Sequence, residues 1–229
     1  MYVSKFLVMA AMFFWAFEVE ARRGERTGFN FGTSLGVSSG SDRGQSSSNE
    51  DSRSAIDASA TSVQPYIGFV LGNHFNLGLS LGFQNSSTSD VETNDVEGFE
   101  VRRLREGQLR QASLTMRFLF AEVMFFEAGA GVYDRRVAIT NETMTGGTNG
   151  TFNARREEYS LRGTGPGYHA GGGFEIPIDR MEGFYFTTAY MVRFFTLREN
   201  ASGLHELGKK TSRIRQQELT FGIAHYVYN

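Results

Sequence analysis

Arginine supplies nearly all the positive charge of this chain. Of its 23 basic residues, only Lys5, Lys209 and Lys210 are lysines. A guanidinium keeps its charge in any protein environment and can hold a phosphate through two parallel hydrogen bonds. Arginines gathered in one place are therefore candidate ligands for phosphate groups.

Two arginine–glutamate combinations have a spacing that suggests ion pairs. Arg117 and Glu127 each lie five residues from Glu122, so a hairpin turn centred there places them opposite each other. Arg193 and Glu218 stand on two later segments that we expect to be neighbouring strands. If these side chains are buried, each charge needs its partner. A packed, satisfied network is one interpretation, and a gated ion pathway is the other.

Few residues are arranged as a catalytic or metal site would require. The chain has no cysteine, which excludes disulfides, a thiol nucleophile and a thiolate metal site. No two of its histidines have metal-ligand spacing; they are His74, His169, His205 and His225. His205, beside Glu206 in a polar segment, could belong to a lipid-modifying enzyme, but no serine is fixed near it. We expect no cofactor and no metal.

Eight segments alternate between large apolar residues and small or polar ones, and we expect these segments to position the side chains described above. In residues 75–84, large apolar residues occupy every second position, and small or polar ones stand between them. This period of two predicts a β-strand with one apolar face. The other seven segments are residues 29–37, 63–72, 112–120, 126–133, 168–176, 184–194 and 218–227.

The connections between these strands also alternate. Three are short, whereas four are long and polar: residues 38–54, 85–98, 140–153 and 199–212. An even strand count with short and long ends is typical of an outer-membrane barrel. The second face is dominated by Gly, Ala, Ser and Thr, which suits the narrow lumen of eight strands. We therefore predict an all-β, eight-stranded antiparallel up-and-down transmembrane barrel with a polar lumen and a lipid-facing apolar exterior.

On these grounds the chain resembles the small eight-stranded outer-membrane β-barrels of Gram-negative bacteria, of the OmpA transmembrane-domain and OmpX type. The resemblance covers about Phe29 to Asn229 and rests on architecture rather than on a signature motif. It implies the bacterial outer membrane, insertion by the barrel assembly machinery and a monomer. Barrels of this class usually end on an aromatic residue, whereas here Tyr228 is penultimate and Asn229 is last.

On several strands, the outward-facing alternation continues past the apolar band toward the long-loop end, and the positions it reaches are arginines. This pattern suggests a collar of arginines at that end. Four of them form the candidate phosphate site for lipopolysaccharide: Arg110, Arg136, Arg162 and Arg198. The same parity adds Arg43, Arg53, Arg213 and Arg215. The alternative is that these residues are only solvated strand ends.

The N-terminus predicts export. Lys5 precedes an apolar run of residues 6–17, and Val19 and Ala21 fit a signal-peptidase site. We expect residues 1–21 to be a cleaved signal peptide, 22–28 a short periplasmic segment and 29–229 the barrel. A membrane anchor is the alternative, but the apolar run is short for a membrane-spanning helix. The formal net charge of −2 gives no case for nucleic-acid binding.

These observations favour a structural or surface-interaction role, exerted through extracellular loops on an unknown ligand and through outer-membrane lipids. A narrow channel for ions or small molecules and a lipid-A-modifying enzyme are the alternatives. The loops contain no recognisable ligand motif.

Overall fold

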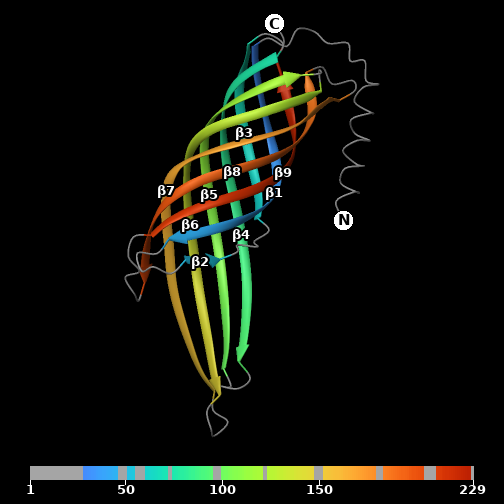
Figure 1. The fold of residues 1–229 in the computed structure, drawn as a ribbon. Helices are drawn as coiled ribbons and strands as arrows, with labels where there is room; N and C mark the ends of the chain where they lie inside the picture. Colours follow the sequence, from blue (N-terminus) through green and yellow to red (C-terminus); the bar gives the residue numbers. More distant parts are fainter. Residues whose placement is uncertain are drawn as a thin grey trace.

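Eight strands close into a ring (Figure 1). The computed structural model describes residues 28–45, 51–54, 60–71, 74–94, 99–120, 123–146, 152–178, 183–203 and 210–227. The strands are β1 (Gly28–Gln45), β2 (Asp51–Ser54), β3 (Ala60–Leu71), β4 (Phe75–Asn94), β5 (Phe99–Phe120), β6 (Met124–Gly146), β7 (Phe152–Pro177), β8 (Phe184–Gly203) and β9 (Lys210–Tyr226).

From β3 to β9, every strand pairs antiparallel with the next, and β1 joins β3 on one side and β9 on the other. The short β2 pairs only with the end of β1, at residues 42–45, and is not part of the ring. The prediction of eight antiparallel strands in an up-and-down barrel is confirmed. Among the described residues, no helix is long and apolar enough to cross a membrane.

The apolar face of every strand lies on the outside. Leu79, in the middle of β4, has 58% of its surface exposed, and Phe31, Leu114 and Phe221 are exposed to a similar extent. Inward positions on the same strands are buried and mostly polar or small, as at Asn30. A soluble barrel would show the reverse arrangement. An apolar exterior around a polar interior, closed without edges, places this chain in an outer membrane.

Glycine in the lumen makes room for larger side chains. A Cβ added at Gly32 would overlap the Tyr66 ring and the Ile223 carbonyl oxygen. One added at Gly129 would overlap the imidazole of His169. An eight-stranded barrel is just wide enough for its own side chains, so large inward residues require small ones opposite them.

Aromatic side chains gather outside the barrel at the short-turn end. The rings of Phe29 and Phe69 meet edge to face at 5.3 Å, and His225 packs 4.2 Å from the Phe184 ring. Such girdles mark the interface of transmembrane barrels. This end is the one we assign to the periplasm.

Strands β4 to β7 are much longer than the sequence predicts. Residues 85–98 and 140–153 were expected to be loops, yet β4 continues to Asn94 and β6 to Gly146. Their partners continue in the same register, so four strands run on together beyond the rest of the ring (Figure 1). Both faces of this extension leave the apolar environment, and the alternation that marks a lipid-facing strand is therefore missing from its sequence.

The predicted signal peptide, most of the predicted periplasmic segment and the terminal Asn229 lie outside the described residues. The described barrel begins at Gly28 and its last strand ends at Tyr226.

Candidate functional site

Near the short-turn end, the lumen contains an arginine held between two carboxylates. Arg117 and Glu127 are direct cross-strand partners on β5 and β6, and Arg117 Nη2 lies 2.7 Å from Glu127 Oε2. Arg117 Nη1 donates to Glu175 Oε1 on β7 at 2.5 Å. Tyr226 donates its hydroxyl to the other Glu175 oxygen at 2.7 Å, and His169 Nε2 lies 3.5 Å from Glu127. All of these groups face the lumen, where they form one connected cluster.

A second pair lies further along the lumen. Arg193 on β8 forms an ion pair with Glu218 on β9, and both side chains are almost completely buried. Ser62 donates to Glu218, and Gln64 donates to its Oε2 at 2.7 Å, so β3 is tied to β9 across β1. The carboxylate thus has three donors, which is the condition for burying a charge without large cost.

A third pair lies closer to the long-strand end. Glu199 on β8 accepts a hydrogen bond from Ser212 and lies 3.4 Å from Arg135 on β6. Gln216 donates to Ser38 at 2.9 Å and to Gln84 at 2.7 Å. Polar contacts therefore continue along the lumen from the short-turn end to the rim.

Two of these ion pairs join residues that the sequence singled out, whereas the pairings of Glu175, Arg135 and Glu199 were not predicted. Glu175, Arg135 and Glu199 each reach an arginine or glutamate on a strand that is not adjacent. Parity alone places Glu175 in the lumen, but no spacing along the chain links it to Arg117. A closed barrel brings such side chains together across its axis.

Two cavities in the described part of the lumen are small and separate from each other. One of about 40 Å³ lies beside Tyr66 and Arg117, and another of about 60 Å³ lies beside Arg135 and Gln216. At a level between the Arg117 and Arg135 clusters, the buried rings of Tyr133 and Phe195 stack 4.5 Å apart and nearly parallel. Side chains therefore fill the described lumen at these levels.

On the outside, the four candidate arginines lie close to one another. Arg136 and Arg162 are direct cross-strand partners on β6 and β7. Arg110 on β5 lies opposite Asp134 on β6, Asp134 lies opposite Thr164 on β7, and Thr164 lies opposite Arg198 on β8, so Arg110 and Arg198 stand at the two ends of one row. The four side chains occupy two neighbouring outward rows of β5 to β8. We call Arg110, Arg136, Arg162 and Arg198 the arginine patch; it covers one side of the rim and does not encircle the barrel.

The guanidiniums of the arginine patch make few contacts with the protein. Arg136 and Arg162 are 47% and 65% exposed, and they approach Asp134 at only 3.7 and 3.9 Å. Neither donates a hydrogen bond within the part of the chain that the structure describes. With four positive charges near Asp134 and Glu106, the patch keeps an excess of two positive charges.

Arg213 and Arg215 extend this basic surface onto β9. With Tyr168 and Phe194, whose rings stack at 5.3 Å, they line an outward groove of about 630 Å³. The Arg215 guanidinium lies 5.7 Å from the centre of the Phe194 ring. The side chains of Arg43 and Arg53, also expected in the collar, lie outside the described residues.

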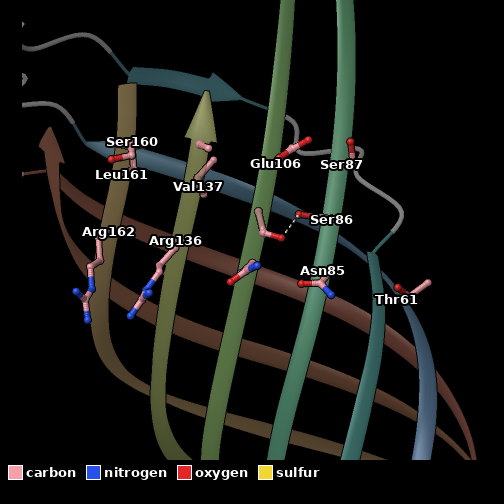
Figure 2. Close-up of a pocket in the computed structure, with 13 residues that line it drawn as sticks. Thr61, Asn85, Ser86, Ser87, Glu106, Arg136, Val137, Ser160, Leu161 and Arg162 are labelled. Atoms are coloured by element: carbon pink, nitrogen blue, oxygen red, sulfur yellow. Dashed lines mark hydrogen bonds between the residues drawn. The ribbon is translucent and has the colours of Figure 1, made fainter. Parts of the chain in front are cut away.

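A shallow hollow of about 670 Å³ adjoins the arginine patch on its long-strand side (Figure 2). Figure 2 shows Arg136 and Arg162 side by side on their strands, with Asn85 and Thr61 on the far side of the hollow. The lining side chains come from β3, β4, β5, β6 and β7.

The residues considered for catalysis, His205 and Glu206, lie outside the described residues. Among the described residues, no group of three or more His, Asp or Glu is placed to hold a metal ion.

No family model matches the sequence, and no curated protein is similar to it in sequence. Solved outer-membrane barrels do match the fold. Ail of Yersinia pestis, solved with the heparin analogue sucrose octasulfate, is 12% identical, with a TM-score of 0.43 over 86% of this chain and 99% of Ail. OprG of Pseudomonas aeruginosa is 10% identical, with a TM-score of 0.45 over 90% and 99%. The outer membrane protease OmpT of Escherichia coli is 8% identical, with a TM-score of 0.38 over 91% and 99%. Ail is the attachment invasion locus protein and OmpT a protease, and at these identities the likeness extends to the barrel fold alone.

Proposed function

We propose that this barrel is a structural, surface-interacting protein of the outer membrane, whose arginine patch binds the phosphates of outer-leaflet lipopolysaccharide. The observation that carries the proposal is the gathering of four outward, weakly engaged guanidiniums at one side of the rim. Guanidinium and phosphate match each other in charge and in hydrogen-bond geometry. The part of the barrel beyond the rim, built on β4 to β7, would meet the extracellular ligand.

The height of the patch in the membrane supports this role. An arginine facing lipid at the bilayer midplane costs about 2–4 kcal/mol, whereas one near the interface costs about 0–1 kcal/mol. Arg110 stands two residues beyond the outward Ala112, and Arg136 four residues beyond the exposed Val132. At that boundary the nearest non-protein groups are lipid headgroups.

The packed lumen favours a scaffold over a channel. The ion pairs of Arg117 and Arg193 satisfy their glutamates, and the stacked rings of Tyr133 and Phe195 fill the lumen between the Arg117 and Arg135 clusters. A lipid-modifying role would rest on His205, and loss of lipid turnover in a His205→Ala variant would support that alternative. We also propose that the barrel is inserted by the assembly machinery as a monomer.

The proposal is tested by changing all four patch arginines to Gln. We expect the variant to fold in neutral detergent, to show wild-type heat-modifiable migration, and to copurify with much less lipopolysaccharide. Lys at the same four sites should restore only part of the binding, because an ammonium lacks the planar fork.

The matched control is Arg155→Gln with Arg156→Gln. These two exposed arginines are as accessible as the patch, but they lie far along β7 and pair with Glu157 and Glu158 at 2.7 Å. Lipopolysaccharide should be retained in this control. Wild-type lipopolysaccharide on the fourfold Gln variant would mean that the patch is only a solvated strand end.

A further inference from the structure

One outward row of the barrel wall presents five exposed polar side chains on five neighbouring strands. The register pairs Thr61 with Asn85, Asn85 with Gln108, Gln108 with Arg136, and Arg136 with Arg162. At the usual strand spacing, the row is about 19 Å long. It forms the floor of the hollow beside the arginine patch (Figure 2).

These side chains make no hydrogen bonds to the protein among the described residues, in contrast to the linked amides of the lumen. All five are exposed. The next outward row, Ser87, Glu106, Ala138 and Ser160, consists mostly of small residues, which leaves the hollow open above the first row.

The chemistry changes along the row. Arg136 and Arg162 at one end offer only positively charged donors, whereas the carboxamides of Gln108 and Asn85 both donate and accept. Glu106 adds an acceptor above Gln108. A ligand that uses the whole row must carry an anionic group at one end and several hydroxyls beside it. A phosphorylated sugar has this composition, whereas a simple phospholipid headgroup would use only the arginine end.

The position of the hollow points to a membrane-anchored sugar. Asn85 and Thr61 stand two residues beyond the exposed Phe83 and Val63, at the edge of the apolar belt that faces the long-strand end. Beyond Arg162 toward the short-turn end, the outward surface of β7 leads into the groove of Tyr168 and Phe194, which can receive an acyl chain.

We propose that the hollow binds the phosphorylated sugar headgroup of an outer-leaflet glycolipid. Arg136 and Arg162 hold the phosphate, and Gln108 and Asn85 hydrogen-bond the sugar hydroxyls. This inference rests on the proposed function, to which it adds the recognition of a saccharide. It assigns specificity for glycolipid over phospholipid to the two carboxamides.

The experiment titrates the full-length barrel in neutral detergent with diphosphorylated lipid A and, separately, with phosphatidylglycerol, and counts bound lipids by native mass spectrometry. For Asn85→Ala with Gln108→Ala, we expect about tenfold weaker binding of lipid A, since two neutral hydrogen bonds together are worth about that much. Binding of phosphatidylglycerol should not change. Gln217→Ala, an exposed outward amide on β9, should leave both lipids at wild-type affinity.

Three results would overturn the inference. Wild-type binding of lipid A by the Asn85 and Gln108 variant would do so, and so would an equal loss of both lipids. Competition by glucosamine 1-phosphate at the same concentration as lipid A would show that the membrane anchor is not needed. If the fourfold arginine variant loses both lipids while the carboxamide variant loses neither, the proposed function stands and only the sugar recognition fails.

Discussion

Replacing Arg117 with Ala should destabilise the folded barrel by about 3–5 kcal/mol, because the change removes the buried cation that Glu127 and Glu175 share. Arg117 forms ion pairs with both Glu127 and Glu175. Its loss affects β5, β6 and β7 together, since one side chain on each of these strands belongs to the cluster.

The magnitude follows from the contacts of the guanidinium. Arg117 donates to Glu127 at 2.9 and 2.7 Å and to Glu175 at 2.5 Å. Hydrogen bonds to charged groups contribute about 1.5–3 kcal/mol each, so the three together set an upper bound of about 5–9 kcal/mol. The adjoining cavity of about 40 Å³ can admit water, and Tyr226 still donates to Glu175. These two effects lower the expected cost of Arg117→Ala to about 3–5 kcal/mol.

A triple variant separates the lost charge from the lost packing. Arg117→Met, combined with Glu127→Gln and Glu175→Gln, removes the cation and both anions while keeping similar volumes. It should cost only about 1–2 kcal/mol, because no charge stays buried alone. Arg156→Ala, an exposed arginine on β7, should cause no measurable change.

Stability is measured by urea unfolding in detergent, followed by circular dichroism and by the heat-modifiable band on a gel. The single tryptophan, Trp15, lies in the expected signal peptide, so indole fluorescence is not a suitable probe. If Arg117→Ala and the triple variant unfold at the same urea concentration, the uncompensated carboxylates are not the cause of the cost.

Three further predictions follow from other features. The mature chain should begin at Arg22 and fractionate with the outer membrane, as shown by N-terminal sequencing and heat-modifiable migration; a soluble periplasmic product would contradict the barrel. Gly129→Ala should destabilise by about 1–3 kcal/mol in urea unfolding, because its Cβ would overlap His169. Gly40→Ala, whose Cβ would lie 3.2 Å from the Arg215 carbonyl oxygen, should cost less than Gly129→Ala, and equal effects would refute the packing argument. In planar bilayers, Arg193→Ala should show no more conductance than wild type, because stacked rings still close the lumen; a new steady current would indicate a channel.

The sequence predicted the ring of strands because lipid imposes one requirement on every outward position. Leu79 and its outward neighbours must be apolar, and this requirement repeats every second residue in all eight strands. The same alternation places Arg117 and Glu127 inward, and the turn centred on Glu122 makes them opposite partners. Local pattern and hairpin geometry are sufficient for both inferences.

The extension of β4 to β7 could not be predicted in this way. Ser87 and Glu106 lie beyond the apolar belt, so neither face of the sheet has to be apolar there. The ion pair of Glu175 with Arg117 could not be predicted for another reason. Glu175 reaches Arg117 across β6, and the distance between non-adjacent strands depends on the closure of the barrel. The shape of the arginine patch likewise depends on the relative register of four strands, which parity within one strand does not give.

The length of the four-stranded extension determines how far the protein reaches from the cell. From Ser87 to Asn94, β4 runs on for eight residues, or about 27 Å along the strand. Its neighbours remain paired with it over this distance, so the two hairpins form one stiff plate rather than separate flexible loops. If the proposed lipopolysaccharide surrounds the barrel, a plate of that length would stand within its sugar layer. Its sides would therefore contact neighbouring saccharides, and its far edge would be the first part of the barrel that an approaching surface meets.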